Sequence, residues 1–243
     1  MADHYWHIKN CNLFQQLPDE EIRFIERNSF FRKFPRGTVV YLPYEHADGV
    51  LLLASGRVKI CTFSLDGKQT ILTFVEPGEL FGELSAFGQA QRENQAQAIE
   101  NSSLLLIPNE EIHRLLRSYP EVSMGITKLI GFRRQRIERR LKYLLFHSNR
   151  ERLIHVLMEL AEDYGRQTDN GIELSIRLSH QDLANIIGAT RETVTVILGD
   201  LQRRGRVRLH RRRVIITDPT SLLASIRPQA SPQHQFEESK LTT

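Results

Sequence analysis

The segment from residue 179 to residue 203 constrains the fold more tightly than any other part of the chain. Ser179 precedes the run H-Q-D-L-A-N-I-I, and Asp182 stands three positions later, which is the spacing of a capped helix start. Gly188 then permits a sharp turn, and Thr190 is placed to cap the following run R-E-T-V-T-V-I-L-G-D-L. A helix, a short glycine turn and a second helix form the helix-turn-helix pattern.

The second of these helices is predicted to have one buried face and one exposed face. The apolar residues that share a side are expected in the core: Val194, Ile197, Leu198 and Leu201. The other side holds few large apolar groups: Glu192, Thr195, Val196, Gly199 and Arg203. Recognition helices meet base edges with their N-terminal residues, where arginine binds guanine and glutamate accepts from cytosine. Arg191 and Glu192 are therefore expected to read base pairs, and Val196 to pack against a thymine methyl group.

Arginines gather in two parts of the chain, although its net charge is only +4. Residues 203–213 hold seven arginines and residues 133–140 hold five, which indicates a polyanionic partner. The run R-V-R-L-H-R-R-R-V-I-I-T predicts a β-hairpin, or wing, whose tip lies beside the phosphates of double-stranded DNA. The residues expected to contact DNA are Ser179, His180, Gln181, Thr190, Arg191, Glu192, Thr193, Thr195, Val196, Arg203, Arg211 and Arg212.

Residues 29–108 have the pattern of an antiparallel β structure. Short apolar runs such as G-V-L-L-L-A and Q-T-I-L-T-F-V alternate with turn residues, and Asp66 and Gly67 stand between two of them. Asp-Gly between alternating runs is a strong hairpin signal. Many short strands at this spacing predict a closed antiparallel barrel or roll.

A long helix is predicted over residues 121–146, directly after Pro120. Its isoleucines and leucines recur at spacings of three, four or seven, as in the seam of a coiled coil. An exposed seam requires a partner, and the simplest one is the same helix of a second copy of the chain. The residues expected at this homodimer interface are Ile126, Ile130, Ile137, Leu141 and Leu144.

The remaining segments complete the expected organisation. Residues 147–152 interrupt the seam and are predicted to form a hinge, followed by an amphipathic helix that ends at Gly165. A short strand is predicted over residues 173–178. Residues 225–243 hold too little apolar content to pack and are expected to be disordered.

The sequence contains no pattern typical of an enzyme or of a metal site. Cys11 and Cys61 have no Cys-x-x-Cys spacing, and we expect both to be ordinary buried thiols. The histidines do not cluster as in metal-dependent rolls, and no catalytic triad order, P-loop or dinucleotide fingerprint occurs. Because no signal segment and no membrane-length apolar run are found, we expect a cytoplasmic protein without membrane association.

Taken in this order, the segments resemble the CRP/FNR family of bacterial transcription regulators over about residues 10–220. S-G-R-V-K-I at 55–60 resembles the family's β-roll turn, and F-G-E-L-S-A at 81–86, followed by Arg92, resembles its effector-pocket segment. The resemblance implies a homodimeric transcription activator that contacts RNA polymerase. Its fold would be α+β in three parts: a double-stranded β-helix (β-roll) effector domain over 10–118, a dimerisation helix over 119–146 and a winged helix-turn-helix domain over 147–220.

The residues leave the implied effector open. Glu83 and Arg92 match positions that hold the ribose and phosphate in cyclic-AMP-binding members, but Glu93 follows where those members have serine, and a carboxylate repels a phosphate. Ile137 and Glu138 replace the Thr-Ser pair that reaches the base in those members. The segment from Arg133 through Glu138 to Arg152 and Leu153 instead has the spacing of the cyanobacterial global nitrogen regulator. In that regulator, two arginines and a glutamate hold 2-oxoglutarate.

Arg92 and Arg133 are accordingly expected to hold an anion, because guanidinium groups suit carboxylates. The residues expected to line the effector site are Gly82, Glu83, Leu84, Arg92, Glu93, Arg133 and Glu138. No iron–sulfur or heme signature is found, so the cofactor is unknown, with 2-oxoglutarate and a cyclic nucleotide as candidates. Two alternatives stay open: a redox-responsive regulator that senses through Cys61, and a DNA-binding protein that needs no effector.

Overall fold

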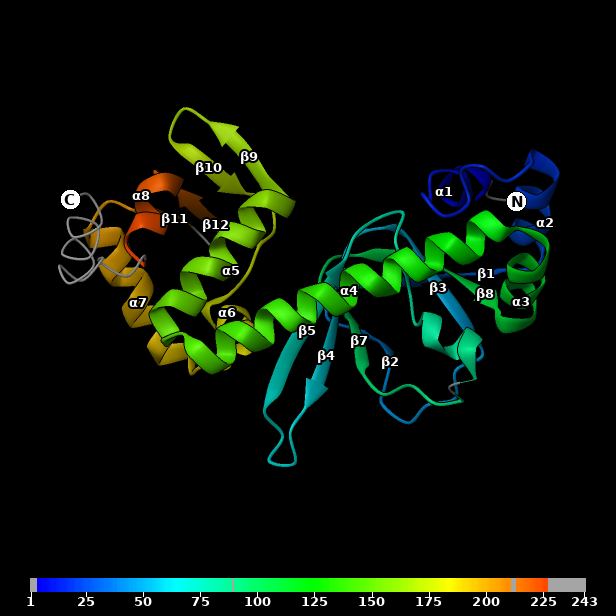
Figure 1. The fold of residues 1–243 in the computed structure, drawn as a ribbon, viewed down its shortest axis with the longest axis horizontal. Coiled ribbons are helices and arrows are strands. Elements are labelled where there is room, and N and C mark those ends of the chain that lie inside the picture. Colours follow the sequence, from blue (N-terminus) through cyan, green and yellow to red (C-terminus); the bar gives the residue numbers. More distant parts are fainter. Residues whose placement is uncertain (1–3, 89, 211–212, 227–243) are drawn as a thin grey trace, which may run out of the picture. The chain divides into compact units, whose positions relative to one another are not determined.

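The structure is a computed structural model that describes residues 4–88, 90–210 and 213–226. The chain divides into two compact units, Met1–Arg140 and Leu141–Thr243. Figure 1 follows the chain through both units and through helix α4 (Pro120–Phe146), which contributes residues to each of them. No helix in the described part of the chain has the length and apolar composition needed to cross a membrane.

The first unit is a β-roll with helices before and after it. Helices α1 (Tyr5–Lys9) and α2 (Asp19–Arg27) precede the roll, and α3 (Asn109–Ser118) and α4 follow it. The roll consists of β1 (Phe30–Phe34), β2 (Val39–Tyr41), β3 (Gly49–Ser55), β4 (Val58–Phe63), β5 (Gln69–Val75), β6 (Leu80–Phe81), the 3-10 helix η1 (Glu83–Phe87), β7 (Gln95–Ala98) and β8 (Ser102–Pro108).

These strands form two antiparallel sheets, with the orders β1-β8-β3-β6 and β2-β7-β4-β5. The predicted roll is therefore confirmed. The hairpin predicted at Asp66 and Gly67 is also confirmed, because β4 and β5 pair up to Phe63 and Gln69 on either side of this turn. Gly67 has a φ of 78°, a conformation that glycine adopts without strain.

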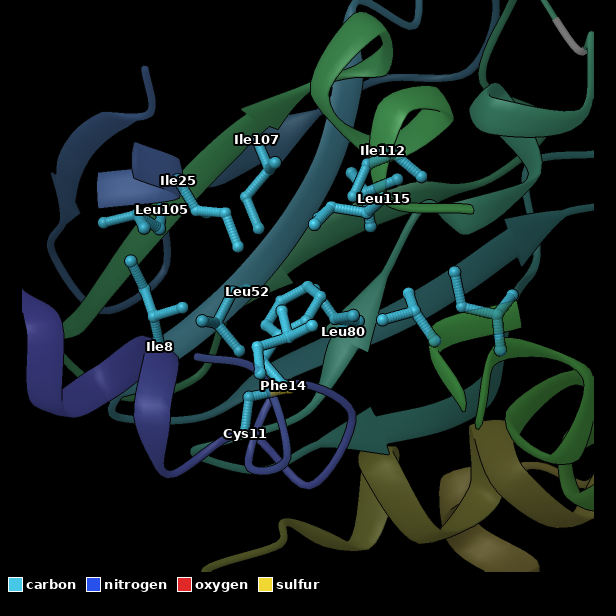
Figure 2. Packing of buried hydrophobic residues seen from close by; sticks show 14 of the residues in the cluster. Ile8, Cys11, Phe14, Ile25, Leu52, Leu80, Leu105, Ile107, Ile112 and Leu115 are labelled. Carbon is cyan, nitrogen blue, oxygen red and sulfur yellow. The ribbon is translucent and has the colours of Figure 1, made fainter. Parts of the chain in front are cut away.

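Strand β3 is buried on both faces, which explains its nearly continuous apolar sequence. Successive side chains of a strand point to opposite faces, so one run of leucines is divided between two cores. Leu51 and Leu53 belong to the interior of the roll, with Val58, Val75 and Phe81. The alternate residues pack against the helices, in the cluster drawn in Figure 2 that includes Ile8, Phe14, Ile25, Leu52, Leu80, Leu105, Ile107, Ile112 and Leu115.

Helix α4 begins at Pro120, as predicted, but its first turns have a different neighbour from the one expected. Val122 and Ile126 are 0% and 1% exposed, and Ile130 packs against the same core cluster. The expectation that Ile126 lies in an exposed dimer seam is therefore wrong. Its side chain is part of the core of its own unit, because the start of α4 follows α3 directly and covers the same apolar cluster.

The second unit is a small α+β domain. It contains α5 (Asn149–Tyr164), α6 (His180–Ile187), α7 (Arg191–Arg203) and α8 (Pro219–Ala224). Its antiparallel sheet has the order β11-β12-β10-β9 and is formed by β9 (Gly165–Thr168), β10 (Gly171–Leu174), β11 (Val207–His210) and β12 (Arg213–Ile216). The predicted helix before Gly165 and the predicted wing hairpin are both confirmed.

The interruption between α4 and α5 is held by the side chains of Ser148, Glu151 and Arg152. The Ser148 hydroxyl accepts from the Glu151 amide, and the Glu151 carboxylate accepts from the Ser148 amide at 2.7 Å, which caps α5. Arg152 donates to the carbonyl oxygens of Leu144 and His147 at 2.6 and 2.8 Å. The carbonyl of Leu144, in the last turn of α4, and that of His147, directly after the helix, are thus satisfied at the segment predicted as a hinge.

The strand predicted over residues 173–178 is wrong in its bounds. Strand β10 ends at Leu174 because its pairing with β9 ends at the Leu174–Gly165 pair. The following residues keep an alternating pattern, with Ile176 and Leu178 buried, but they join no strand. Strand β9 was not predicted because all of its residues are exposed and carry no apolar alternation. Beyond residue 226, the tail predicted to be disordered lies outside the described residues.

Candidate functional site

Helices α6 and α7 are fixed by the caps that the sequence predicts. The Ser179 hydroxyl accepts from the Asp182 amide at 3.1 Å, and the Asp182 carboxylate accepts from the Ser179 amide at 2.9 Å. Gly188 ends α6 with a φ of 69°, and Thr190 caps α7 by accepting from the Thr193 amide at 3.2 Å. The predicted helix-turn-helix is therefore confirmed.

The two faces of α7 separate as the sequence predicts. Val194, Leu198 and Leu201 are fully buried, whereas Ile197 is only partly buried. On the outward side, Val196 is 69% exposed. The other outward residues that are exposed are Arg191, Glu192, Thr195 and Arg203, whereas Thr193 is half-buried.

The first turn of α7 presents two opposite charges that are not paired with each other. In the ranges 4–88, 90–210 and 213–226, neither the Arg191 guanidinium nor the Glu192 carboxylate makes a side-chain hydrogen bond or an ion pair. Asp200, further along the helix, instead binds Arg150 at 2.5 Å and Arg204 at 3.0 Å. The start of the helix is therefore free to present both charges to a partner.

The wing lies next to this helix pair in the fold of the second unit. Strands β11 and β12 form the wing, where Arg208 lies opposite Ile215 and His210 lies opposite Arg213. Arg211 and Arg212, predicted to contact phosphates at the wing tip, lie outside the described residues. A concave surface joins the wing to the two helices; its lining residues are Leu178, Ser179, His180, Gln181, Leu183, Arg191, Leu209, His210, Arg213 and Val214.

The first unit encloses a cavity of about 330 Å³ between the roll and α4. All seven residues predicted for the effector site line it. The sequence analysis did not assign several further lining residues, including Tyr41, Ile60, Leu72, Thr73, Ser85, Gln91, Asn94, Arg134 and Arg136. Tyr41, Ile60 and the pair Leu72 and Thr73 come from β2, β4 and β5, so no local pattern connects these to the cavity, whereas the others lie within a few positions of a predicted residue.

Arg92 is the most deeply buried cation of this cavity, with 8% exposure. It donates to the carbonyl oxygens of Gly82 and Gly49 at 2.9 and 2.6 Å, and its guanidinium carbon lies 4.7 Å from the centre of the Tyr41 ring. Burial lowers the pKa of the Arg92 guanidinium and raises the pKa of Tyr41 to about 12. Gly82 has a φ of 71°, and a Cβ there would lie 2.3 Å from the Arg92 guanidinium, so any other residue would be strained and would require Arg92 to shift.

Glu83 and Arg133 form the second charged contact of the cavity. The Arg133 guanidinium donates to the Glu83 carboxylate and to the Leu80 carbonyl oxygen, each at 2.5 Å. Glu83 is 7% exposed. Arg134 and Glu138, which also line the cavity but are more exposed, pair at 3.0 Å. In this structure, three lining arginines thus have partners from the chain itself.

The remaining seam residues of α4 are exposed. Ile137, Leu141 and Leu144 are 55%, 53% and 40% exposed, respectively. Phe132 and Leu145, which the seam spacing does not include, are also exposed. The helix therefore presents large apolar side chains along its second half.

Both cysteines are buried, as predicted. Burial raises the pKa of the Cys11 thiol to about 11, so this thiol is not a ready nucleophile. Cys61, in β4, is fully buried. Among the described residues, no group of three or more histidine, cysteine or carboxylate side chains is arranged to hold a metal ion.

A β-roll with a cavity that contains buried charged side chains, a long helix and a winged helix-turn-helix define a class of DNA-binding transcription regulators. Two family models match the chain accordingly. Residues 31–119 match the model described as a cyclic nucleotide-binding domain, and residues 151–225 match the Crp-like helix-turn-helix domain.

Two characterised proteins are similar over most of their length. The chain is 30% identical over 202 residues to the cyclic AMP receptor protein of Thermus thermophilus. The aligned region covers 83% of this chain and 90% of that protein. It is 30% identical over 192 residues to the global nitrogen regulator of Synechococcus elongatus, which covers 78% and 86%, respectively. The chain therefore belongs to the CRP/FNR family, whose members are transcription regulators and not enzymes.

A solved structure supports the fold. CooA from Carboxydothermus hydrogenoformans aligns with a TM-score of 0.72 at 24% identity, over 82% of this chain and 88% of that one. The α+β architecture predicted from the sequence is thus confirmed by an independent structural match.

Proposed function

We propose that this regulator binds a pseudo-palindromic promoter site as a homodimer, and that a small organic anion in the cavity of the roll controls the binding. The observation that carries the proposal is the first turn of α7. There Arg191 and Glu192 are exposed, and the capped helix beneath them is anchored by buried Val194 and Leu198. Side chains at this end of a recognition helix reach base edges in the major groove.

The exposed half of α4 supports the dimer. Ile137 and Leu141 are each more than half exposed, and they lie four positions apart on one face of the helix. A contiguous apolar face of this kind is typical of an interface. Two copies of the helix packed along this face would bury these side chains and present two copies of α7 to one DNA duplex.

The chemistry of the cavity supports an anion. Arg92 and Arg133 contribute two positive charges, of which Glu83 offsets one. Glu93 also lines the cavity, and its carboxylate would repel the phosphate of a cyclic nucleotide. We therefore favour a carboxylate effector such as 2-oxoglutarate over cyclic AMP, although relatives named for each activity are similar to this chain.

The pairing of the cavity arginines favours a second candidate function. Arg133 binds Glu83, and Arg92 binds two carbonyl oxygens, so both guanidinium groups have partners from the chain itself. This supports a regulator that binds DNA without an effector. Sensing through Cys61 is less well supported, because a fully buried thiol is not accessible to an oxidant.

Genome-wide mapping of bound sites tests the proposal, followed by transcription with RNA polymerase on the strongest site. The proposal predicts a shared inverted repeat upstream of the regulated genes, and activation from that site. Titration of 2-oxoglutarate and of cyclic AMP then tests the effector. If 2-oxoglutarate changes DNA affinity in the wild type but not in Arg92→Gln or Arg133→Gln, the cavity is its site. If neither compound has an effect, the effector-free candidate gains support.

A further inference from the structure

His180, the first residue of α6, is held in a defined tautomer by α7. Its Nδ1 lies 2.8 Å from the Thr195 hydroxyl oxygen, and that hydroxyl donates to the Arg191 carbonyl oxygen, also at 2.8 Å. A hydroxyl has one proton, and a carbonyl oxygen only accepts. The Thr195 hydroxyl therefore donates its proton to the Arg191 carbonyl oxygen. Nδ1 of His180 must then carry a proton and donate it to the Thr195 hydroxyl oxygen.

This assignment fixes the chemistry of the other ring nitrogen. A neutral imidazole carries a single N–H, so Nε2 of neutral His180 has a lone pair and no proton. Among the residues that the structure describes, none hydrogen-bonds Nε2. Only the protonated ring can donate from Nε2 while Nδ1 keeps its bond to Thr195.

The surroundings of His180 favour an anion. His180 lines the concave surface between the helix pair and the wing, together with Arg191 from α7 and His210 and Arg213 from the wing. Among the described residues that line this surface, none carries a carboxylate. The nearby carboxylate of Asp182 is bound by Ser179, and the carboxylate of Glu173 is bound by Arg213 at 2.6 Å.

We propose that His180 binds a backbone phosphate of DNA through Nε2 in its imidazolium form, so that DNA binding takes up one proton. The inference rests on the proposed DNA-binding function and adds a linkage to pH. A neutral Nε2 would present a lone pair to the phosphate oxygens and repel them. The protonated ring instead forms a charge-assisted hydrogen bond with them.

The direction of the pH effect follows from the free protein. Burial, and then the positive charge of Arg191, lower the pKa of His180 below its ordinary value of 6.5. A bound phosphate favours the charged ring and raises the pKa in the complex. DNA affinity therefore rises as the pH falls from the pKa of the complex toward that of the free protein, by at most about tenfold per pH unit for one proton.

The test measures the dissociation constant at constant salt from about pH 6 to pH 8.5, because phosphate contacts depend strongly on salt. Two duplexes are used, the strongest genomic site and a random sequence, since a phosphate contact is independent of sequence. We expect both affinities to rise as the pH falls. We expect His180→Gln to lose this slope and His180→Arg to bind tightly without it. His46→Gln, at an exposed histidine of the first unit, is the control and should keep the wild-type slope, and His210→Gln is measured beside it because this histidine lines the same surface.

The tautomer argument also predicts the effect of Thr195→Val, which the other arguments do not. Without the hydroxyl, neutral His180 can carry its proton on Nε2 and donate to the phosphate, so binding above neutral pH should lose its pH dependence.

A wild-type slope in His180→Gln would overturn the proposal, as would a slope lost only in His210→Gln. If the wild type binds both duplexes equally, the sequence-specific function fails, but the slope on either duplex still decides the role of His180. If neither duplex is bound at any pH, both proposals are wrong.

Discussion

The cavity of the roll and the exposed face of α7 use the same two residue types in opposite ways. In the cavity, the Glu83 carboxylate is 7% exposed and accepts from the Arg133 guanidinium at 2.5 Å. On α7, Arg191 and Glu192 are adjacent and exposed, and within the described part of the chain their side chains bind neither each other nor any other residue.

This difference separates charge that stabilises the fold from charge that is available for recognition. A buried carboxylate needs its partner, because an unpaired buried charge is strongly destabilising. An exposed, unpaired charge contributes little to the stability of the fold. Its removal changes the free energy of unfolding by only about a few tenths of a kcal/mol. Variants in the cavity should therefore change stability, whereas variants at the start of α7 should change DNA binding alone.

The largest effect is expected when the exposed half of α4 is made charged. The double substitution Ile137→Lys and Leu141→Lys should give a monomer, because two lysines on each helix would repel across the interface. Loss of the second half-site should weaken specific binding by about a hundredfold or more. Sedimentation velocity checks the mass, with Gln135→Lys on another face of α4 as the control. A dimer that persists would show that the interface lies elsewhere.

The next effect tests the cavity side of the comparison. Arg133→Ala leaves the Glu83 carboxylate buried without its partner and should lower the free energy of unfolding by about 1 to 3 kcal/mol. Adding Glu83→Gln removes the charge and should recover part of this loss. Urea unfolding of the single and double variants measures both changes. If Arg133→Ala is as stable as the wild type, the pair is not structural, and the contrast with α7 disappears.

The corresponding substitution on α7 is at Arg191, and it should leave the free energy of unfolding unchanged. Arg191→Ala removes one bidentate contact to a base and should cost about 1 to 3 kcal/mol of affinity on the selected site. Binding to random DNA should change much less, since a base contact carries the sequence preference. Fluorescence anisotropy with both duplexes, next to urea unfolding, distinguishes the two losses. Equal losses on both duplexes would make Arg191 a phosphate contact instead.

The smallest effect is expected at Asp200, which is half-buried and paired with arginines. The hydrogen bond from Arg150, assisted by Arg204, holds the pKa of the Asp200 carboxyl below its usual value of 3.8. A lowered folded-state pKa contributes stability that is present above pH 3.8 and is lost as the pH falls through the folded value. Asp200→Asn should therefore lower the thermal midpoint slightly at neutral pH and have no effect in strong acid. Glu192→Gln, an unpaired exposed carboxylate, should change the midpoint at neither pH.

Features that depend on neighbours in the sequence could be predicted, and features that depend on distant partners could not. The caps at Ser179 and Thr190 and the turn at Asp66 involve groups within a few residues, so their spacing is sufficient. Strand β7 was missed because its sequence Q-A-Q-A has little strand propensity, and it is fixed by pairing with β2 and β4.

The two charged sites differ in the same way. The outward direction of Glu192 follows from the helix period alone, because Glu192 shares one face with Val196 and Gly199. The contact between Glu83 and Arg133 joins residues fifty positions apart, and only the family resemblance placed both at the cavity. The error at Ile126 has a related cause, because an apolar spacing on a helix indicates a buried face but not whether the neighbour belongs to the same chain.

Selection of binding sites from random DNA tests most directly the claim that a dimer reads base pairs with the start of α7. The wild type should enrich an inverted repeat with a guanine and a cytosine in each half-site, and the half-site centres should lie roughly 10 to 10.5 base pairs apart, or a multiple of that. Val196→Arg should shift one further base pair in each half-site toward guanine, because arginine donates where valine cannot. A selection that enriches no inverted repeat, or one in which Val196→Arg returns the wild-type motif, would contradict this account.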